Sequence, residues 1–191
     1  ARATQGKYPP GSVIKPFTAV AALETGTITP DTVFDGAIED NKWLPTEEGW
    51  DGGTITRISD SGSPLKLSNA LVNSDNIYFA YIALKMGAEP FVSYMDKIGM
   101  TSATPFDLQV ASAQILNQGN DMTRSRLAHS GYGQGELLVT PLQMAAMYTA
   151  FANGTGDIMQ PVLVEKTCRT EGLDYVTVTE TQPTAWVKGA V

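Results

Sequence analysis

Cysteine and histidine, two residue types that often carry nucleophilic or metal chemistry, are almost absent from this chain. Cys168 is the single cysteine, so a disulfide within the chain is excluded. His129 is the single histidine, which excludes a Ser-His-Asp or Cys-His catalytic set and a multi-histidine metal site built from this chain alone. Residues 162–167, just before Cys168, are predicted to form a strand, so we expect a packed or incidental thiol. Any nucleophilic chemistry must therefore use a base other than histidine.

Basic residues are scarce relative to acidic ones, and long apolar runs are missing. The 13 lysines and arginines are outnumbered by 20 aspartates and glutamates, giving a formal net charge of −7. Nucleic-acid binding depends on clustered Lys and Arg, so this balance argues against a nucleic-acid partner. No run of about 18 apolar residues occurs, and no basic segment followed by an apolar one opens the chain. We therefore expect residues 1–191 neither to span a membrane nor to carry an export signal.

What is present is enough apolar sequence for one folded domain, or a large part of one. Hydrophobic residues make up 42% of the 191 positions and charged residues 17%, a composition that can bury a core. Helical spacing dominates and strand signals are few, which predicts a helix-rich α+β fold. The first expected helix begins beside Ser12 and ends at Gly26. The other expected helices cover 65–73, 77–86, 90–98 and 141–151. Short strands and loops are expected over 27–60, a strand pair at 161–167 and 175–178, and a helical turn after Pro183.

Each of these five helices has a signal in the sequence for one of its ends. Gly26, Gly87 and Gly99 follow the last periodic residues of the helices before them, where glycine commonly ends a helix. Ser63 is followed by Pro64 and Thr140 by Pro141, the pattern of a cap residue and a proline at the first helical position. Both pairs are therefore predicted to begin helices.

Ser12 and Lys15 form the first pair of residues with catalytic potential. Pro16 is compatible only with the first turn of a helix, which places Ser12 at or next to the helix start. Residues three apart share a helix face, so the Lys15 ammonium and the Ser12 hydroxyl can meet. A serine hydroxyl is a weak nucleophile until a neighbour removes its proton. Lysine can do this if burial or a nearby positive charge lowers its pKa.

The spacing of this pair is not specific by itself. A serine three residues before a lysine is expected by chance roughly once in a chain of this length. The sequence contains a second case, Ser63 with Lys66. We interpret Ser63 as a helix cap rather than a nucleophile, and Ser12 could be a cap as well if it is judged on its pair alone.

Ser74-Asp75-Asn76 lies between two predicted helices, and its presence favours Ser12 as a nucleophile over Ser12 as a helix cap. The tripeptide is expected by accident in only about a few per cent of chains of this length. Its side chains project from a connection, where Ser74 could relay a proton between the lysine and a leaving amine. The Asn76 amide could donate to a substrate carbonyl while accepting from another group. The structural alternative is a turn with a serine or Asx cap.

Together, these motifs resemble those of the penicillin-binding proteins. The resemblance rests on residues 8–17 (YPPGSVIKPF), 74–76 (SDN), 133–135 (GQG) and 140–145 (TPLQMA). A Ser-x-x-Lys followed by Ser-Asp-Asn occurs in this group and in class A β-lactamases. The last two segments, in this order, are similar to class B penicillin-binding proteins rather than to a β-lactamase, and the resemblance extends from Arg2 to about Val187.

The resemblance implies a D,D-transpeptidase that cross-links peptidoglycan, the bacterial cell wall. Ser12 would attack the penultimate D-alanine carbonyl of a stem peptide, and the acyl-enzyme would pass to an amino group of a neighbouring strand. Lys15 would be the general base, Ser74 the proton relay, and Asn76 the group that holds the acyl side-chain amide. β-Lactams would acylate Ser12 stably. No metal or organic cofactor is implied, and residues 133–135 are interpreted as a structural loop.

The third motif of the family, Lys followed by Ser or Thr and Gly, does not occur. Lys166-Thr167 is followed by Cys168, and Lys188 by Gly189. We therefore interpret residues 1–191 as one partial transpeptidase domain, the helical half of a serine β-lactamase-like fold without most of its central sheet. The resemblance also implies a membrane-tethered parent at the extracytoplasmic face of the cell membrane, and helix faces left without the sheet predict self-association.

Two alternative functions stay open at this stage. One is a non-catalytic β-lactam sensor or scaffold domain, although Ser12, Lys15, Ser74 and Asn76 are all present. The other is a serine β-lactamase, for which no deacylating glutamate motif is visible. Whether residues 1–191 are active by themselves depends on whether two of the three motifs suffice for acylation.

Overall fold

The computed structural model describes residues 2–191, which form two compact units. The first, here called the helical unit, comprises residues 8–96 and 114–138. The second, here called the hairpin unit, comprises residues 2–7, 97–113 and 139–191. The predicted helix-rich α+β class is confirmed, and no helix within residues 2–191 is long and apolar enough to cross a membrane.

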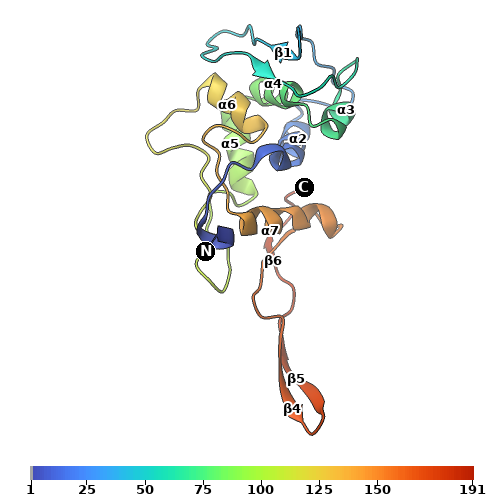
Figure 1. Ribbon diagram of the computed structural model, residues 1–191, viewed down its shortest axis with the longest axis vertical. Coiled ribbons are helices and arrows are strands. Elements are labelled where there is room, and N and C mark those ends of the chain that lie inside the picture. The colour runs from blue at the N-terminus through green and yellow to red at the C-terminus, as the bar shows by residue number, and fades with distance from the viewer. Residues whose placement is uncertain (1) are drawn as a thin grey trace. The chain divides into compact units, whose positions relative to one another are not determined.

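The helical unit begins with a short 3-10 helix that continues directly into an α-helix (Figure 1). Two strands of two residues each form an antiparallel pair in the following loop-rich segment, as expected for 27–60. The elements are η1 (Gly11–Ile14), α2 (Lys15–Glu24), β1 (Lys42–Trp43), β2 (Ile55–Thr56), α3 (Leu67–Val72), α4 (Asn76–Met86), α5 (Ala88–Lys97) and α6 (Arg124–Gly131).

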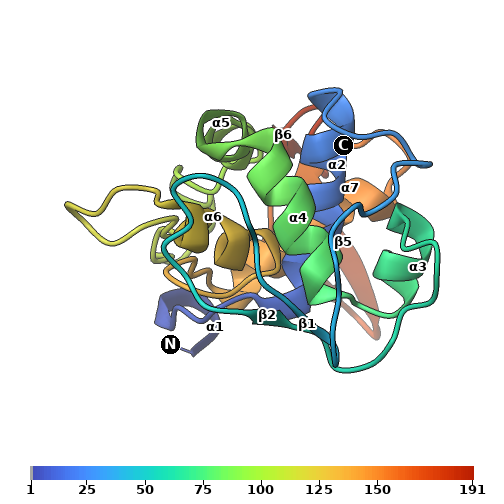
Figure 2. The same cartoon turned by 90° about the horizontal axis from the view of Figure 1, so that it is seen from above.

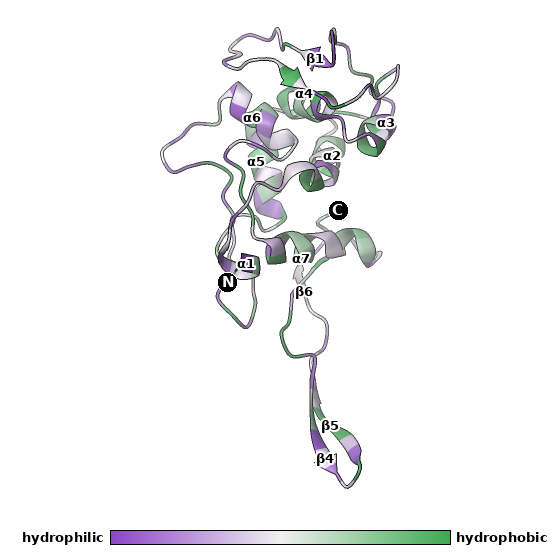
Figure 3. Cartoon of the chain, viewed as in Figure 1, coloured by the Kyte–Doolittle hydropathy of each residue, from purple (hydrophilic) through white to green (hydrophobic). Residues whose placement is uncertain are grey.

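Helix α4 is the central element of this unit. Nine of its residues are buried, from Ile77 to Met86, and Figure 3 shows it as predominantly hydrophobic. A helix that is apolar on every side needs partners all round. Figure 2 shows α6 on one side of α4 and α2 and α3 on the other, and all three helices contact it. The residues that follow Ser74 are thereby held firmly in the core.

Helices α4 and α6 approach closely because Gly131 has no side chain. A Cβ atom at Gly131 would lie 2.6 Å from the Cβ of Ala83 and 2.7 Å from the carbonyl oxygen of Phe79. Both distances are far below van der Waals contact, and one of the atoms belongs to the backbone of α4. Only glycine fits this crossing without displacing a helix.

We expect Gly131→Ala to lower the free energy of unfolding by about 1–3 kcal/mol, the usual range for overpacking a core. Gly53→Ala is the matched control, because a Cβ there meets nothing within 4 Å. Its stability should stay within about 0.5 kcal/mol of the wild type. Urea unfolding of the two variants measures both values, and equal midpoints would show that α4 and α6 separate without strain.

Most predicted helix boundaries of the helical unit are confirmed, with one correction. Pro16 lies in the first turn of α2, and Gly26 and Gly87 follow α2 and α4 with positive φ. Ser63, however, is not a helix cap: α3 begins after Lys66. The Lys66 N–H donates to the side chain of Asn69 at 2.6 Å, so the cap of this helix lies three residues after the predicted Ser63.

Helix α6 was not predicted from the sequence. Its first turn carries two arginines and a serine, so it lacks the apolar spacing that identifies a helix. Thr123 caps it by accepting from the Arg126 N–H at 3.4 Å, and Asp51 accepts from the Ser125 N–H at 2.8 Å. The second of these partners comes from a loop more than 70 residues away, which no local pattern indicates.

The hairpin unit combines two helices with two antiparallel strand pairs. In Figure 1, β4 and β5 form a two-stranded ribbon that extends away from α7. Strand β3 pairs with β6 near the base of this ribbon. The elements are α1 (Arg2–Gln5), α7 (Pro141–Ala152), β3 (Ile158–Met159), β4 (Lys166–Glu171), β5 (Asp174–Glu180) and β6 (Ala185–Val187).

Three predictions for this unit can be compared with the structure. Thr140 caps α7 as predicted, since its side chain accepts from the Gln143 N–H at 3.2 Å. The segment after Pro183 is wrong as a helical turn: it is strand β6, because its main chain pairs with β3. Of the two alternatives for Cys168, a packed or an incidental thiol, packing is wrong, because the residues of β4 and β5 are exposed and so is the thiol.

Candidate active site

Ser12 and Lys15 are joined by one turn of 3-10 helix. The Lys15 N–H donates to the Ser12 carbonyl, the bond that closes this turn. In a 3-10 helix, side chains three residues apart eclipse each other, so the two side chains leave the same edge. Ser12 is exposed, whereas Lys15 is 2% exposed. The structure thus places an accessible hydroxyl one turn before a buried amine.

The backbone just before Ser12 is fixed by Gly133. The Gly11 N–H donates to the Gly133 carbonyl at 2.8 Å. A Cβ at Gly133 would lie 2.0 Å from the Gly11 carbonyl oxygen, and the φ of Gly133 is +85°. Only glycine allows this approach, which agrees with our interpretation of residues 133–135 as a structural loop.

The amine of Lys15 is directed at the turn between α3 and α4. Its Nζ donates to the Ser74 carbonyl, to Ser74 Oγ at 3.0 Å and to Asn76 Oδ1 at 2.8 Å. An ammonium has three protons, so these three acceptors satisfy it fully. The structure therefore brings Lys15 together with Ser74 and Asn76, which follow it by 59 and 61 residues.

Burial sets the protonation of Lys15. Removal from water disfavours the charged form and lowers the pKa of Lys15 to about 8, while the negative charge of Asp75 acts in the opposite direction. The ring of Phe79 lies 5.6 Å from Nζ. At pH 7 roughly a tenth of this amine is therefore neutral, the form that a proton acceptor requires.

The turn that receives Lys15 is held at both ends. Ser74 has a φ of +54°, which points its carbonyl and hydroxyl to the same amine. Asp75 caps α4 by accepting from the Tyr78 N–H at 3.0 Å. The other end of the Asn76 amide, Nδ2, donates to the Thr56 carbonyl of β2 at 3.0 Å. Asn76 is therefore fixed with its oxygen towards Lys15.

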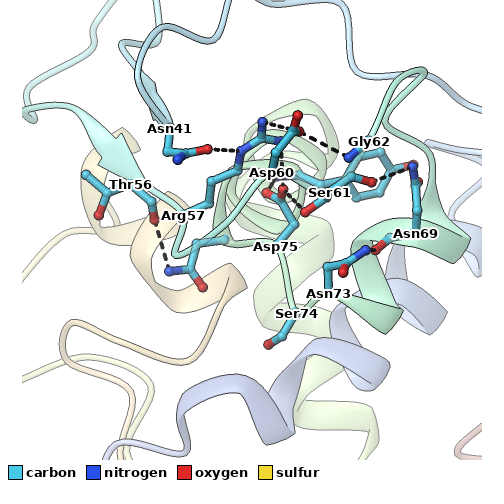
Figure 4. A network of polar contacts seen from close by, with 12 residues as sticks. Asn41, Thr56, Arg57, Asp60, Ser61, Gly62, Asn69, Asn73, Ser74 and Asp75 are labelled. Atoms are coloured by element: carbon cyan, nitrogen blue, oxygen red, sulfur yellow. Dashed lines mark hydrogen bonds and ion pairs between the residues drawn. The ribbon is translucent and has the colours of Figure 1, made fainter.

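A second layer of polar residues surrounds Asp75, and sequence reasoning missed it (Figure 4). Asp75 Oδ2 accepts from Ser61 Oγ at 2.6 Å and from Arg57 Nη1 at 3.2 Å. Arg57 also donates to Asn41 at 3.0 Å and to Asp60 at 2.6 Å. Asp75 could have been recognised as a helix cap before an apolar run, but no signal in the sequence connects Arg57 to it.

The second Ser-x-x-Lys pair forms no comparable site. Lys66 Nζ donates to Asp31 at 2.9 Å on the surface instead of to a hydroxyl. Within residues 2–191, no cluster of three His, Cys, Asp or Glu side chains is arranged to hold a metal ion. Among the candidate residues, only the set around Lys15 combines an accessible hydroxyl with a buried amine.

The arrangement is suited to moving one proton. Once Lys15 is neutral, its two remaining protons can stay on the Ser74 carbonyl and the Asn76 amide oxygen, which only accept. The Ser74 hydroxyl can both donate and accept, so it can turn its proton towards the free lone pair of Nζ. Lys15 can thus take up a proton from one hydroxyl and pass one on through another.

Comparison with known proteins gives a family match over residues 1–191, described as "Penicillin binding protein transpeptidase domain". Penicillin-binding protein 3 of Bacillus subtilis is 36% identical over 163 residues, which cover 85% of this chain and 24% of that protein. The peptidoglycan D,D-transpeptidase MrdA of Haemophilus influenzae is 30% identical and covers 86% of this chain and 26% of its own length. The chain spans about a quarter of the length of these curated relatives.

Solved structures agree with the sequence match. The penicillin G acyl-enzyme complex of penicillin-binding protein A from M. tuberculosis superposes with a TM-score of 0.77 at 27% identity. The similarity covers 98% of this chain and 41% of that one. The imipenem acyl-enzyme complex of the same protein also has a TM-score of 0.77, at 28% identity and with 100% of this chain covered.

Proposed function

Because this chain belongs to the penicillin-binding protein transpeptidase family, we propose that it supplies the acyl-accepting serine of a peptidoglycan D,D-transpeptidase, and that this serine is Ser12. The observation that carries the proposal is the buried amine of Lys15, held by Ser74 and Asn76 one 3-10 turn after an exposed hydroxyl. A serine needs such a neighbour to become a nucleophile.

In the proposed first step, Ser12 Oγ forms a bond to the penultimate D-alanine carbonyl carbon of a stem peptide. Lys15 takes the hydroxyl proton as general base. The C–N bond to the terminal D-alanine breaks, and Ser74 delivers a proton to the leaving amine. In the second step, an amino group of a neighbouring peptidoglycan strand attacks the ester. An amide forms, the bond to Ser12 Oγ breaks, and Ser12 regains its proton.

Asn76 is proposed to bind the substrate as well as Lys15. Its Oδ1 accepts from Lys15 and one proton of Nδ2 is donated to Thr56, which leaves the second Nδ2 proton for another acceptor. The acyl side-chain amide of the donor substrate offers such a carbonyl. Asn76 would then link the position of the substrate to the position of the base.

β-Lactams are proposed to acylate Ser12 through the same step, because their strained amide is attacked in place of the peptide. Acyl-enzyme complexes with β-lactams are known for the penicillin-binding protein A structures named above, which supports this proposal. The name of the MrdA relative likewise supports peptidoglycan as the substrate. The place of action is proposed to be the extracytoplasmic face of a bacterial membrane, reached through a tethered parent.

Residues 1–191 are further proposed to act as part of one transpeptidase domain. They hold the Ser-x-x-Lys and Ser-Asp-Asn motifs but no Lys-Thr-Gly, the group expected to bind the substrate carboxylate. The proton-transfer groups are all within the helical unit. Acylation by β-lactams is therefore the activity on which this chain is best tested.

The test is the pH dependence of acylation by benzylpenicillin, followed as the gain of one penicillin in intact-protein mass. If Lys15 is the base, the rate rises with pH through the pKa of Lys15, about 8, and levels off above it, because only the neutral amine accepts a proton. A flat profile between pH 6 and 9.5 would show that another group takes the proton. Complete absence of acylation would favour the non-catalytic scaffold.

A further inference from the structure

Ser74 has a backbone conformation that must be maintained by its surroundings. Its φ of +54° lies in the left-handed region, which residues with a side chain other than Asn, Asp or His rarely adopt. Both Ser74 groups that contact Lys15, the carbonyl and the hydroxyl, depend on this conformation. If the turn relaxes, Lys15 loses two of its three acceptors.

Asp75 is the residue that holds this turn in place. It is 2% exposed, and its carboxylate accepts from the Tyr78 N–H, from Ser61 and from Arg57. In Figure 4 the Asp75 side chain points towards Arg57, whereas the Ser74 side chain points away from it. Neighbouring residues are thus anchored on opposite sides of the turn.

Arg57 is itself rigidly fixed. Its side chain is 8% exposed and reaches Asp75, Asp60 and Asn41 with three different nitrogens. A guanidinium is always charged and presents its donors in a planar fork, so it can satisfy all three acceptors without moving. The orientation of the Asp75 carboxylate is therefore determined by Arg57 as well as by the helix that Asp75 caps.

Asp75 also affects Lys15 through its charge. The groups in contact with Nζ include Ser74, Asn76 and the Phe79 ring, all neutral, and the negative charge of Asp75 also acts on it. That field raises the pKa of Lys15 and so opposes the effect of burial. A cation paired with Asp75 weakens the field, which favours the neutral amine.

We propose that Arg57 is a positioning residue for the Lys15 site: acting through Asp75, it holds Ser74 and Asn76 against Lys15 and limits the negative charge that the amine experiences. Its meaning for catalysis rests on the proposed function, whereas its effect on Lys15 does not. Arg57 lies 19 residues before Asn76 and belongs to none of the four sequence segments that carry the resemblance to the family.

The direct test is the titration of Lys15 itself, read from the ¹³Cε signal of labelled lysine by NMR, with the signal assigned from its loss in Lys15→Met. Arg57→Met leaves Asp75 unpaired, so the midpoint should rise by roughly one pH unit. Asp75→Asn removes the negative charge but keeps an acceptor for Ser61, so the midpoint should fall. The two substitutions in one ion pair thus have opposite expected effects, which a purely structural role would not produce.

Asp60→Asn is the matched control. Asp60 is 75% exposed on its side chain and contacts Arg57 from the solvent side, so its loss leaves the contact between Arg57 and Asp75 intact. The titration midpoint of Lys15 in Asp60→Asn should equal that of the wild type. Arg57→Lys keeps a positive charge beside Asp75 and should lie between the wild type and Arg57→Met, which tests the proposal even if Arg57→Met unfolds.

Acylation by benzylpenicillin is then measured on the same variants. At pH 7, a rise of one unit in the midpoint lowers the neutral fraction of Lys15, and with it the acylation rate, about tenfold. Unchanged Lys15 midpoints in Arg57→Met and Asp75→Asn, or shifts in the same direction, would overturn the proposal for Arg57. Opposite shifts without any acylation of the wild type would instead overturn the proposed function and leave the role of Arg57 standing.

Discussion

Ser12→Ala is expected to abolish covalent labelling by benzylpenicillin, because the hydroxyl oxygen that forms the ester is removed. The side chain is exposed at the start of η1, and the carbonyl of Ser12, rather than its hydroxyl, closes the 3-10 turn. The fold should therefore be unaffected. Intact-protein mass should show the gain of one penicillin in the wild type and no gain in Ser12→Ala.

Ser63→Ala is the matched control for this experiment. Ser63 is the other serine that lies three residues before a lysine, and it is also exposed. Its lysine is paired with Asp31 on the surface rather than held in a buried site. Labelling of Ser63→Ala should equal that of the wild type, and labelling that survives in Ser12→Ala would place the nucleophile elsewhere.

Lys15→Met is expected to slow acylation by about 10²–10⁴-fold, the usual contribution of a positioned general base. Methionine fills much of the same volume but cannot accept a proton. The loss should appear in the rate at every pH, and the rise around pH 8 expected for the wild type should disappear. The time course of the mass gain between pH 6 and 9.5 measures both effects.

The corresponding control is Lys66→Met, which alters the second Ser-x-x-Lys pair. Lys66 is half-buried and its amine contacts Asp31, 2.9 Å away, so its removal should leave the acylation rate and its pH profile unchanged. Thermal melts of both variants show whether each remains folded. A Lys15→Met variant that is folded and acylated at the wild-type rate would rule out Lys15 as the base.

Several parts of the fold could be predicted because they depend on neighbouring residues. Thr140 and Pro141 begin α7, and Gly87 ends α4, through contacts within one turn of the helix itself. Where a residue far away in the sequence decides which secondary structure forms, prediction from the sequence failed. Helix α6 is capped in part by Asp51, and the segment after Pro183 becomes a strand because β3 pairs with it.

In the candidate site, too, some features depend on neighbouring residues and others on distant ones. The sequence by itself determined which groups are available: a hydroxyl and an amine three residues apart at a helix start, and a Ser-Asp-Asn turn between helices. Only the tertiary structure decided that Lys15 meets Ser74, 59 residues away, and that Arg57 holds Asp75. The pKa of Lys15 also belongs to the tertiary structure, because desolvation and charge act through space and depend on which distant residues pack around the amine.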